Sequence, residues 1–345
     1  MKEEKVRLSE YCSAAGCGCK ISSDVLGSIL FSGKQKDQSK KVYVDNSNFD
    51  DAAAIEINEN ELLLSTTDFF TPIVDDAFEF GRIAAANSVS DIFAMGGYPV
   101  LALSLLGWPL SKLSADIASE VIQGAETLCS TIDLSISGGH SIESPEPFFG
   151  LSVNGLVEKN RLKKNRGALP GDKIFLTKPL GAGILATAVK KKIIETSDYQ
   201  NLLKSLTRVN SIGRVLSKFS KVHCMTDVTG FGLCGHLIEV CRGSNMTANI
   251  LFDQIPVMSN LQNYISAGSV PGGTNKNRRS FSNYVQKQDI HIDEILYDPQ
   301  TNGGILLFCS PDLELEVSRI LEDENLHYNV IGEVLPASEC FVKVI

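Results

Sequence analysis

The chain has 345 residues, of which 43% are apolar and 21% are charged, and its formal net charge at pH 7 is −9. This length favours two domains over a single core, and the composition is that of a globular protein. The negative charge gives no electrostatic attraction to nucleic acid or to an anionic membrane, so we expect neither as a partner.

The first 48 residues are expected to form a flexible arm. Their start lacks the apolar core of a signal peptide, and the longest apolar run of the chain, 100–110, is too short to cross a bilayer. We therefore expect a cytoplasmic protein whose nine cysteines are reduced thiols. Cys17, Cys19 and Lys20 lie in a glycine-containing stretch that can move, and their spacing is not that of a zinc site.

Strands and helices alternate from residue 49 onward. Apolar periodicity predicts strands at 51–57, 61–67, 134–139 and 148–157, and helices at 79–97 and 114–130. The basic, turn-rich segment 161–172 predicts a boundary. The expected division is an arm at 1–48, a first domain at 49–158 and a second at 159–345.

The second domain mixes helices and strands without a regular βαβ alternation. Strands are expected at 173–179, 222–227, near 305–309 and at 328–334, with helices at 183–193, 201–219 and 232–242. This pattern favours two α+β domains over one doubly wound sheet. The Gly-x-Gly-x-x-Gly at 230–235 matches the dinucleotide fingerprint, but it has no obvious ribose-binding acid, so close packing of a helix start is the favoured reading.

Four aspartates stand where side chains from separate elements can converge. Asp51, Asp68 and Asp227 lie at predicted strand ends, while Asn87 and Asp91 share one face of an otherwise apolar helix. A buried carboxylate is costly unless it is paired, and oxygen ligands suit Mg²⁺ that carries nucleotide phosphates. The alternative is that these acids bind backbone amides at turns.

The stretch SGGHS, 137–141, follows a predicted strand. Its paired glycines allow close backbone approach, so that amides and hydroxyls could hold phosphate or ribose. An ordinary tight turn remains the alternative.

Several segments together resemble the selenophosphate synthetase family, nearly from end to end. They include GCGCKI (16–21), DDAA (50–53), NSVSDIFAMGG (87–97), SGGHSIESPEPFFGLSVNG (137–155) and TDVTGFGLCGH (226–236). The aspartate-rich segments are shared with a wider group of ATP-using enzymes that includes aminoimidazole ribonucleotide synthetase, whereas GCGCK is particular to the synthetases. The resemblance implies the two-domain α+β fold of that group, with a flexible glycine-rich arm at the N-terminus.

The resemblance also implies roles for matching positions. Cys17 and Lys20 would be catalytic, and the metal ligands for Mg²⁺ would be Asp51, Asp91 and Asp227. The ATP-binding set would be Lys20, Asn48, Phe49, Asp50, Asp68, Asn87, Asp91, Gly139, His140 and Ser141. A homodimer is implied, with the ATP site near the subunit contact and residues 139–141 reaching in from the partner.

The reaction implied is the conversion of ATP, selenide and water to selenophosphate, AMP and phosphate, which would supply activated selenium for selenocysteine and selenouridine. ATP and hydrogen selenide are both anions, so several Mg²⁺ ions would be needed to let them meet. Two alternatives stay open. One is another ATP-using enzyme of the same fold, such as a small-molecule kinase, and the other is a thiol-based redox protein that uses Cys17 and Cys19.

Overall fold

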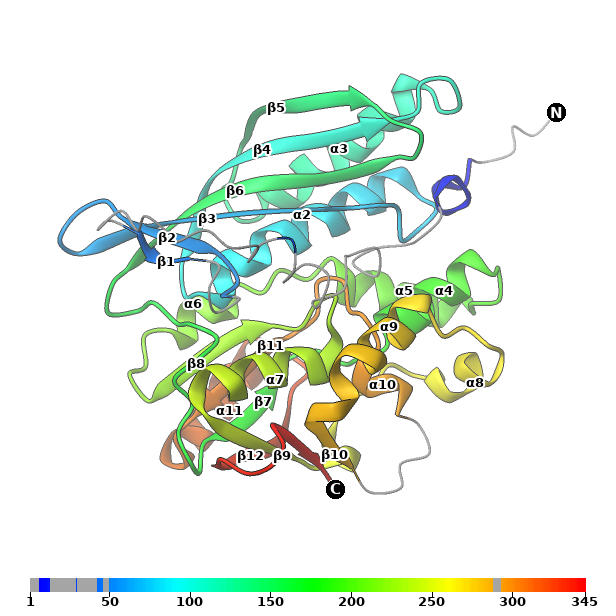
Figure 1. The fold of residues 1–345 in the computed structure, drawn as a ribbon. Coiled ribbons are helices and arrows are strands. Elements are labelled where there is room, and N and C mark those ends of the chain that lie inside the picture. Colours follow the sequence, from blue (N-terminus) through cyan, green and yellow to red (C-terminus); the bar gives the residue numbers. More distant parts are fainter. Residues whose placement is uncertain (1–5, 13–28, 30–41, 46–49, 288–292) are drawn as a thin grey trace.

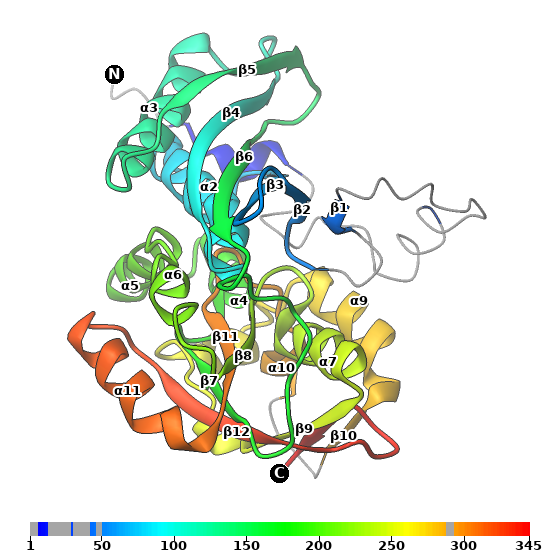
Figure 2. The ribbon, with the colours of Figure 1, turned by 90° about the vertical axis from the view of Figure 1, so that its left-hand side faces the viewer.

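The computed structural model describes residues 6–12, 29, 42–45, 50–287 and 293–345. These residues form two β-sheets that lie one above the other, each accompanied by helices (Figure 1). Figure 2 shows the two layers from the side, with helix α2 at their junction. The α+β architecture expected from the sequence is confirmed.

The first sheet has six strands in the order β1-β2-β3-β6-β4-β5. All neighbouring pairs are antiparallel except β4 with β5. Helices α2 and α3 contact each other, and α2 packs on β3 and β6. The elements are β1 (Val42–Val44), β2 (Ala53–Glu56), β3 (Glu61–Phe70), α2 (Ala77–Ala94), β4 (Tyr98–Trp108), α3 (Ala115–Ser130), β5 (Ile136–Glu143) and β6 (Phe148–Glu158).

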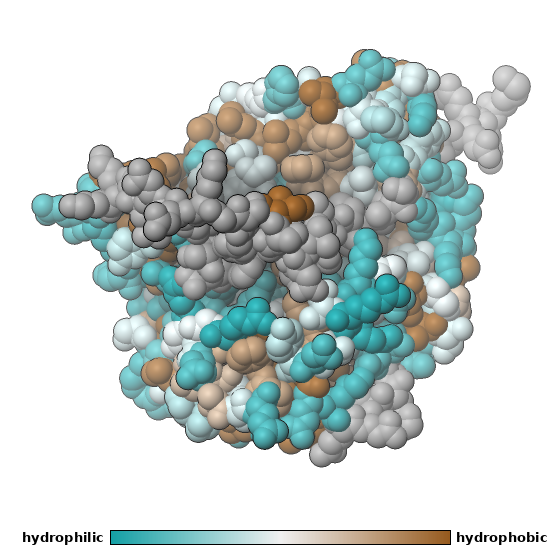
Figure 3. Space-filling view, in the orientation of Figure 1, coloured by the Kyte–Doolittle hydropathy of each residue, from teal (hydrophilic) through white to brown (hydrophobic). Residues whose placement is uncertain are grey.

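Side-chain alternation along β3 separates the two faces of this sheet. Leu62, Leu64 and Phe70 are buried beneath the helices, whereas Phe69 points to the opposite face and is 50% exposed. That opposite face carries more exposed apolar side chains, which form a brown area in the upper part of Figure 3. We call it the outer face, and its exposed residues include Phe69, Leu101, Leu103 and Ile142.

The second sheet has seven strands in the order β10-β13-β9-β12-β7-β11-β8. Its strands are β7 (Lys173–Leu176), β8 (Val222–Asp227), β9 (Met246–Ile250), β10 (Val285–Lys287), β11 (Ile305–Cys309), β12 (Asn329–Pro336) and β13 (Val342–Val344). Its helices are α4 (Ala182–Lys190), α5 (Thr196–Leu206), α6 (Ile212–Leu216), α7 (Gly232–Ser244), α8 (Leu261–Ser266), α9 (Gly272–Phe281), α10 (Glu294–Tyr297) and α11 (Glu314–Asp323).

Both faces of the second sheet are covered at its centre. Ile174 and Leu176 of β7 join the cluster that contains the side chains of α7, while Phe175 between them joins a second cluster with α6 and α11. The last three residues of β7 are therefore all apolar, as expected for a strand buried on both sides.

Helix α2 lies between the two sheets and is buried on most of its surface. It begins at Asp76, whose side chain accepts a hydrogen bond from the backbone N–H of Glu79, as an N-cap does. Besides the first sheet, α2 contacts α5, α6 and β8. Residues of α2 can therefore reach groups from both domains.

The structure differs from the sequence-based expectations in three places. Residues 98–108 were not predicted as a strand but form β4; a continuous apolar run has no alternation to identify it. The helix predicted at 201–219 is two helices, α5 and α6, because Asn210 between them turns its side chain to Ser90 and Gly303. Residues 137–141 are part of β5, so the tight turn that the sequence left open as an alternative does not form there.

Two pieces of the expected arm belong to the folded structure. Leu8–Tyr11 form a short 3₁₀ helix in which Leu8 is fully buried, and Val42–Val44 form β1. Cys17, Lys20, Asn48 and Phe49 lie outside the described residues.

Among the helices in the described ranges, none combines the length and the apolar character that crossing a membrane requires.

Candidate metal and nucleotide site

Three carboxylates converge where the two sheets meet at α2. Asp51 lies two residues before the start of β2, Asp91 lies in α2, and Asp227 ends β8. One oxygen of each lies within 4.8 Å of the others. The first domain thus contributes two of these residues and the second domain contributes one.

Each carboxylate is oriented by a hydroxyl group. Two of these hydrogen bonds cross between the domains, from Thr226 to Asp51 and from Ser90 to Asp227. The donors and acceptors are Thr226 Oγ1 to Asp51 Oδ1 (2.7 Å), Ser90 Oγ to Asp227 Oδ2 (2.5 Å) and Thr66 Oγ1 to Asp91 Oδ2 (2.5 Å).

The electrostatics of this cluster favour a bound cation. Burial, followed by the neighbouring carboxylates of Asp227 and Asp91, raises the pKa of Asp51 well above its usual range. Asp51 Oδ2 is buried and receives no hydrogen bond from the described part of the chain. An all-oxygen set with an unsatisfied carboxylate fits a hard divalent cation such as Mg²⁺.

Lys178 is a buried ammonium group near this cluster. Its Nζ donates to the backbone oxygens of Arg208 at 2.7 Å and Asn302 at 2.8 Å. Burial lowers the pKa of Lys178 to about 7, and the charge of Asp227 opposes that effect. The lysine fixes the loops that follow α5 and precede β11, against which α2 packs.

Asp68 on β3 and Asn87 on α2 form a hydrogen-bonded pair next to the three carboxylates. Asn87 Nδ2 donates to Asp68 Oδ2 at 2.5 Å, and Asn87 Oδ1 accepts from the backbone N–H of Asn302 at 2.7 Å. Because Asp68 is two residues after Thr66 on β3 and Asn87 is one turn before Asp91 on α2, the same pair of elements makes both contacts. Asn87 and Asp91 thus lie on the same face of α2, as predicted, and both contact β3 from it.

Asp50 does not belong to the group of three carboxylates, and its contacts are with residues 165 and 166. Its Oδ1 accepts from the backbone N–H of Asn165 at 3.1 Å, and its Oδ2 lies 3.7 Å from Arg166 Nη1. Burial raises the pKa of Asp50, and Arg166 opposes that shift. Asp50 therefore joins the segment between the domains to the start of β2.

Gly139, His140 and Ser141 are not brought to the carboxylates within this chain. They lie in β5, at the edge of the sheet and three strands from β3, a separation of about 14 Å at about 4.8 Å per strand. Gly139 has a positive φ of 153°, and a Cβ there would lie 2.1 Å from the backbone oxygen of Ser104. The glycine is required by the close pairing of β5 with β4.

Sequence reasoning missed the polar residues that hold the acids. Thr226 and Ser90 are each adjacent to a predicted metal ligand, so a search for hydroxyls beside the acids would have found them. Lys178 and Asn210 carry no such signal, because their partners lie far away in the sequence: Arg208 and Asn302 for Lys178, and Ser90 and Gly303 for Asn210.

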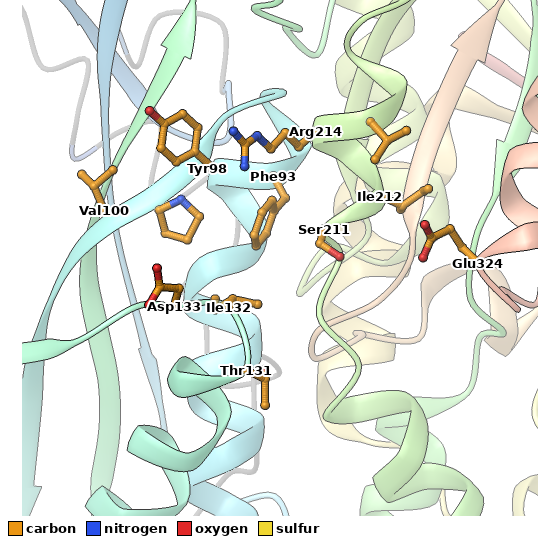
Figure 4. Close-up of a pocket in the computed structure, with 12 residues that line it drawn as sticks. Phe93, Tyr98, Val100, Thr131, Ile132, Asp133, Ser211, Ile212, Arg214 and Glu324 are labelled. Atoms are coloured by element: carbon orange, nitrogen blue, oxygen red, sulfur yellow. The ribbon is translucent and has the colours of Figure 1, made fainter.

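A separate pocket of about 710 Å³ lies between the end of α2, the start of β4 and α6 (Figure 4). Its wall includes Phe93 and Tyr98, and the Arg214 guanidinium lies 4.1 Å from the centre of the Tyr98 ring. Phe93 is two residues after Asp91, which turns its side chain about 200° around the helix. This pocket is therefore not an extension of the carboxylate site.

The cysteines of the described residues are mostly inaccessible. Six of the seven are buried, and Cys340 is partly exposed. Burial raises the pKa of Cys129, Cys234, Cys241 and Cys309 to about 12. These thiols are protonated at neutral pH.

The fold and the sequence both have known relatives. Residues 49–157 match the N-terminal domain of AIR synthase related proteins, and residues 170–345 match their C-terminal domain. Over 337 residues the chain is 44% identical to a selenide, water dikinase of Enterobacter sp. (strain 638) and 45% identical to that of Escherichia coli O157:H7, covering 98% of this chain and 97% of each relative.

Solved structures with lower identity share the fold. The thiamine-monophosphate kinase of Stenotrophomonas maltophilia K279a has a TM-score of 0.65 at 22% identity, covering 89% of this chain and 92% of that one. The hydrogenase maturation protein HypE in complex with ATP has a TM-score of 0.64 at 18% identity, covering 84% and 81%. The expected AIR synthase-like fold is therefore confirmed.

Proposed function

The chain belongs to the AIR synthase related family and, within it, to the selenide, water dikinases, and from this premise we propose that it converts ATP, selenide and water to selenophosphate, AMP and phosphate. The observation that carries this proposal beyond the family relationship is the convergence of Asp51, Asp91 and Asp227 from two domains. On a chain of net charge −9, anionic substrates need such a centre.

The carboxylates of Asp51, Asp91 and Asp227 would hold Mg²⁺, and Thr226, Ser90 and Thr66 keep their oxygens directed into the site. Divalent cations bound there would neutralise the phosphate charge of ATP and stabilise charge that develops during phosphoryl transfer. The protein's own contribution is to place substrates in line and to limit the access of water.

The other predicted site residues fall into two groups, those proposed to contact the nucleotide and those proposed to be catalytic. Asp68 and Asn87 lie beside the carboxylates and are proposed to face the nucleotide, together with Asp50 and residues 48–49. Cys17 and Lys20 remain proposed catalytic residues, with the lysine supplying positive charge at the transferred phosphate and the thiol bringing selenium.

We also propose a homodimer formed through the outer face of the first sheet. Its exposed Phe69, Leu101, Leu103 and Ile142 are the kind of contiguous apolar surface that a second copy would cover. Strand β5 is the open edge of that sheet, so residues 139–141 of a second copy could be carried toward the ATP site. We also propose that the boundary between the two domains lies at 158/159 and that the protein is located in the cytoplasm.

The test is phosphorus NMR of the purified protein with ATP and Mg²⁺, with and without selenide. A selenophosphate resonance together with AMP, both requiring selenide, is expected. ATP turnover that is indifferent to selenide would instead assign the site to another ATP-using enzyme of the same fold.

A further inference from the structure

Residues 6–12 lie across both domains, and we call this segment the clasp. Arg7 Nε donates to Asp75 Oδ2 at 2.6 Å, and Arg7 Nη2 donates to the backbone oxygen of Val189 at 3.1 Å. Asp75 precedes α2 of the first domain, and Val189 lies in α4 of the second. One guanidinium group therefore joins the two domains.

Further contacts fix the clasp on both sides. Leu8 is fully buried and Cys12 is 6% exposed, so the segment is packed as well as hydrogen-bonded. Its other polar contacts include Ser9 Oγ to Asp75 Oδ1, Cys12 Sγ to the backbone oxygen of Pro72 (3.6 Å), Lys190 Nζ to the backbone oxygen of Cys12 (2.7 Å) and Lys192 Nζ to Glu10 Oε1 (2.9 Å).

The clasp and the carboxylate site secure opposite ends of the same helix. Asp76 caps the start of α2, and Asp91 lies fifteen residues later, about 22 Å along the axis at about 1.5 Å per residue. At the far end, Ser90 and Asp227 make the interdomain contact beside the carboxylates. Helix α2 also contacts α5, α6 and β8 of the second domain, so without the clasp these contacts alone would hold its start. A shift of α2 there would change the distance between Asp227 and the two acids of the first domain.

We infer that the clasp, through the Arg7–Asp75 pair, is a positioning element for the proposed reaction. It sets the relative orientation of the domains that form the carboxylate site, and it fixes the chain at Cys12, five residues before Cys17. Five residues extend at most about 18 Å, so the place where Cys12 is held limits where the thiol can act. This inference rests on the proposed function.

A purely stabilising role predicts a different outcome. The side chains of Arg7 and Asp75 are 24% and 23% exposed, and ion pairs at such positions contribute about 1 kcal/mol or less to folding. Arg82 and Glu79 form a matched pair, 33% and 22% exposed, but both belong to α2. Loss of the Arg7–Asp75 pair or of the Arg82–Glu79 pair should lower the free energy of unfolding by a similar amount. Only loss of the Arg7–Asp75 pair should change the relative orientation of the two domains.

The experiment compares Arg7→Ala, Asp75→Ala, the double variant and the control Arg82→Ala. Phosphorus NMR gives the selenophosphate formed per ATP consumed. We expect a roughly tenfold fall in this ratio for both single variants, equivalent to about 1.4 kcal/mol of lost positioning, and no change for the control. Because Arg7 also contacts Val189 and Asp75 also contacts Ser9, the double variant should be worse than either single variant, but by less than the product of the two single effects.

A second readout does not depend on activity. Maleimide labelling of the native protein, with peptide mapping, reports the accessibility of Cys12. Labelling should be at least tenfold faster in Arg7→Ala than in the wild type or in Arg82→Ala.

The two readouts separate the possible failures. A wild type that makes no selenophosphate refutes the proposed function, while protected Cys12 in Arg7→Ala refutes the clasp. Equal losses in Arg7→Ala and Arg82→Ala, or a proportional loss of ATP consumption and selenophosphate, would overturn the positioning role.

Discussion

Replacement of Asp51 by Asn should have opposite effects on stability with and without metal. At 4.8 Å, two carboxylate charges repel by about 3 kcal/mol at an effective dielectric constant of about 20, and Asp51 takes part in two of the three pairs. Solvent contact and protonation of Asp51 reduce this repulsion, so we expect a net stabilisation of about 1–3 kcal/mol in Asp51→Asn without metal. The amide can still accept the hydrogen bond from Thr226.

The pH dependence provides a second measure of the same repulsion. Because the pKa of Asp51 is raised in the folded protein, the folded chain keeps a proton that the unfolded chain releases above about pH 4. The metal-free wild type therefore loses stability as pH rises from that value through the raised pKa, and Asp51→Asn should lose less.

The assay is thermal unfolding in EDTA and in excess Mg²⁺, with the exposed Asp116→Asn as control. In EDTA the apparent Tm of Asp51→Asn should exceed that of the wild type by about 2–6 °C. Mg²⁺ should raise the Tm of the wild type and of the control, but hardly that of Asp51→Asn, whose activity should fall by about 100-fold or more. A variant that is less stable in EDTA, or that gains as much from Mg²⁺ as the wild type, would refute the assignment of this cluster.

Three other outcomes are expected. Cys17→Ser should abolish selenide-dependent AMP formation in phosphorus NMR, and an equal output from the variant would remove the thiol from the mechanism. Phe69→Asp, which places a charge on the outer face, should convert a dimer to a monomer in light scattering after size exclusion; an unchanged mass would exclude this face as the contact. Burial raises the pKa of Asp298 to about 7, so between about pH 4 and pH 7 the wild type should lose a few kcal/mol relative to Asp298→Asn in urea unfolding, and parallel pH profiles would contradict this.

Asp91 and Asp227 could be singled out from the sequence because each has a recognisable position in a predicted helix or strand. Asp227 ends a strand whose limits were predicted correctly, and Asp91 interrupts an apolar helix face where an acid needs a partner. The hydroxyls beside these acids are visible in the sequence, but which acid each hydroxyl contacts is not. Ser90 and Asp227 are 137 positions apart, and their contact depends on how α2 packs against the second domain.

The errors in the fold have similarly local causes. Gly138 and Gly139 left a turn open as an alternative, because glycine pairs usually mark one. Here Gly139 is needed where β5 approaches β4 closely, and sequence periodicity does not report such a contact. Strand β4 was missed because apolar side chains lie on both of its faces. Leu101, Leu103 and Leu105 lie on the outer face and Leu106 lies on the other, so polar residues do not mark one face as exposed.

The buried thiols bear on chemical selectivity. Selenium that is already bonded to a sulfur atom, as in a perselenide, is attacked by thiolates in the same way as a disulfide, so a second accessible thiolate would divert it into side products. In the described domains, side chains that remain protonated within the packed interior react slowly as nucleophiles. The two domains therefore expose few thiolates that could react with selenium. A selenium atom carried on a cysteine during the proposed reaction would have few other sulfur atoms to which it could be lost.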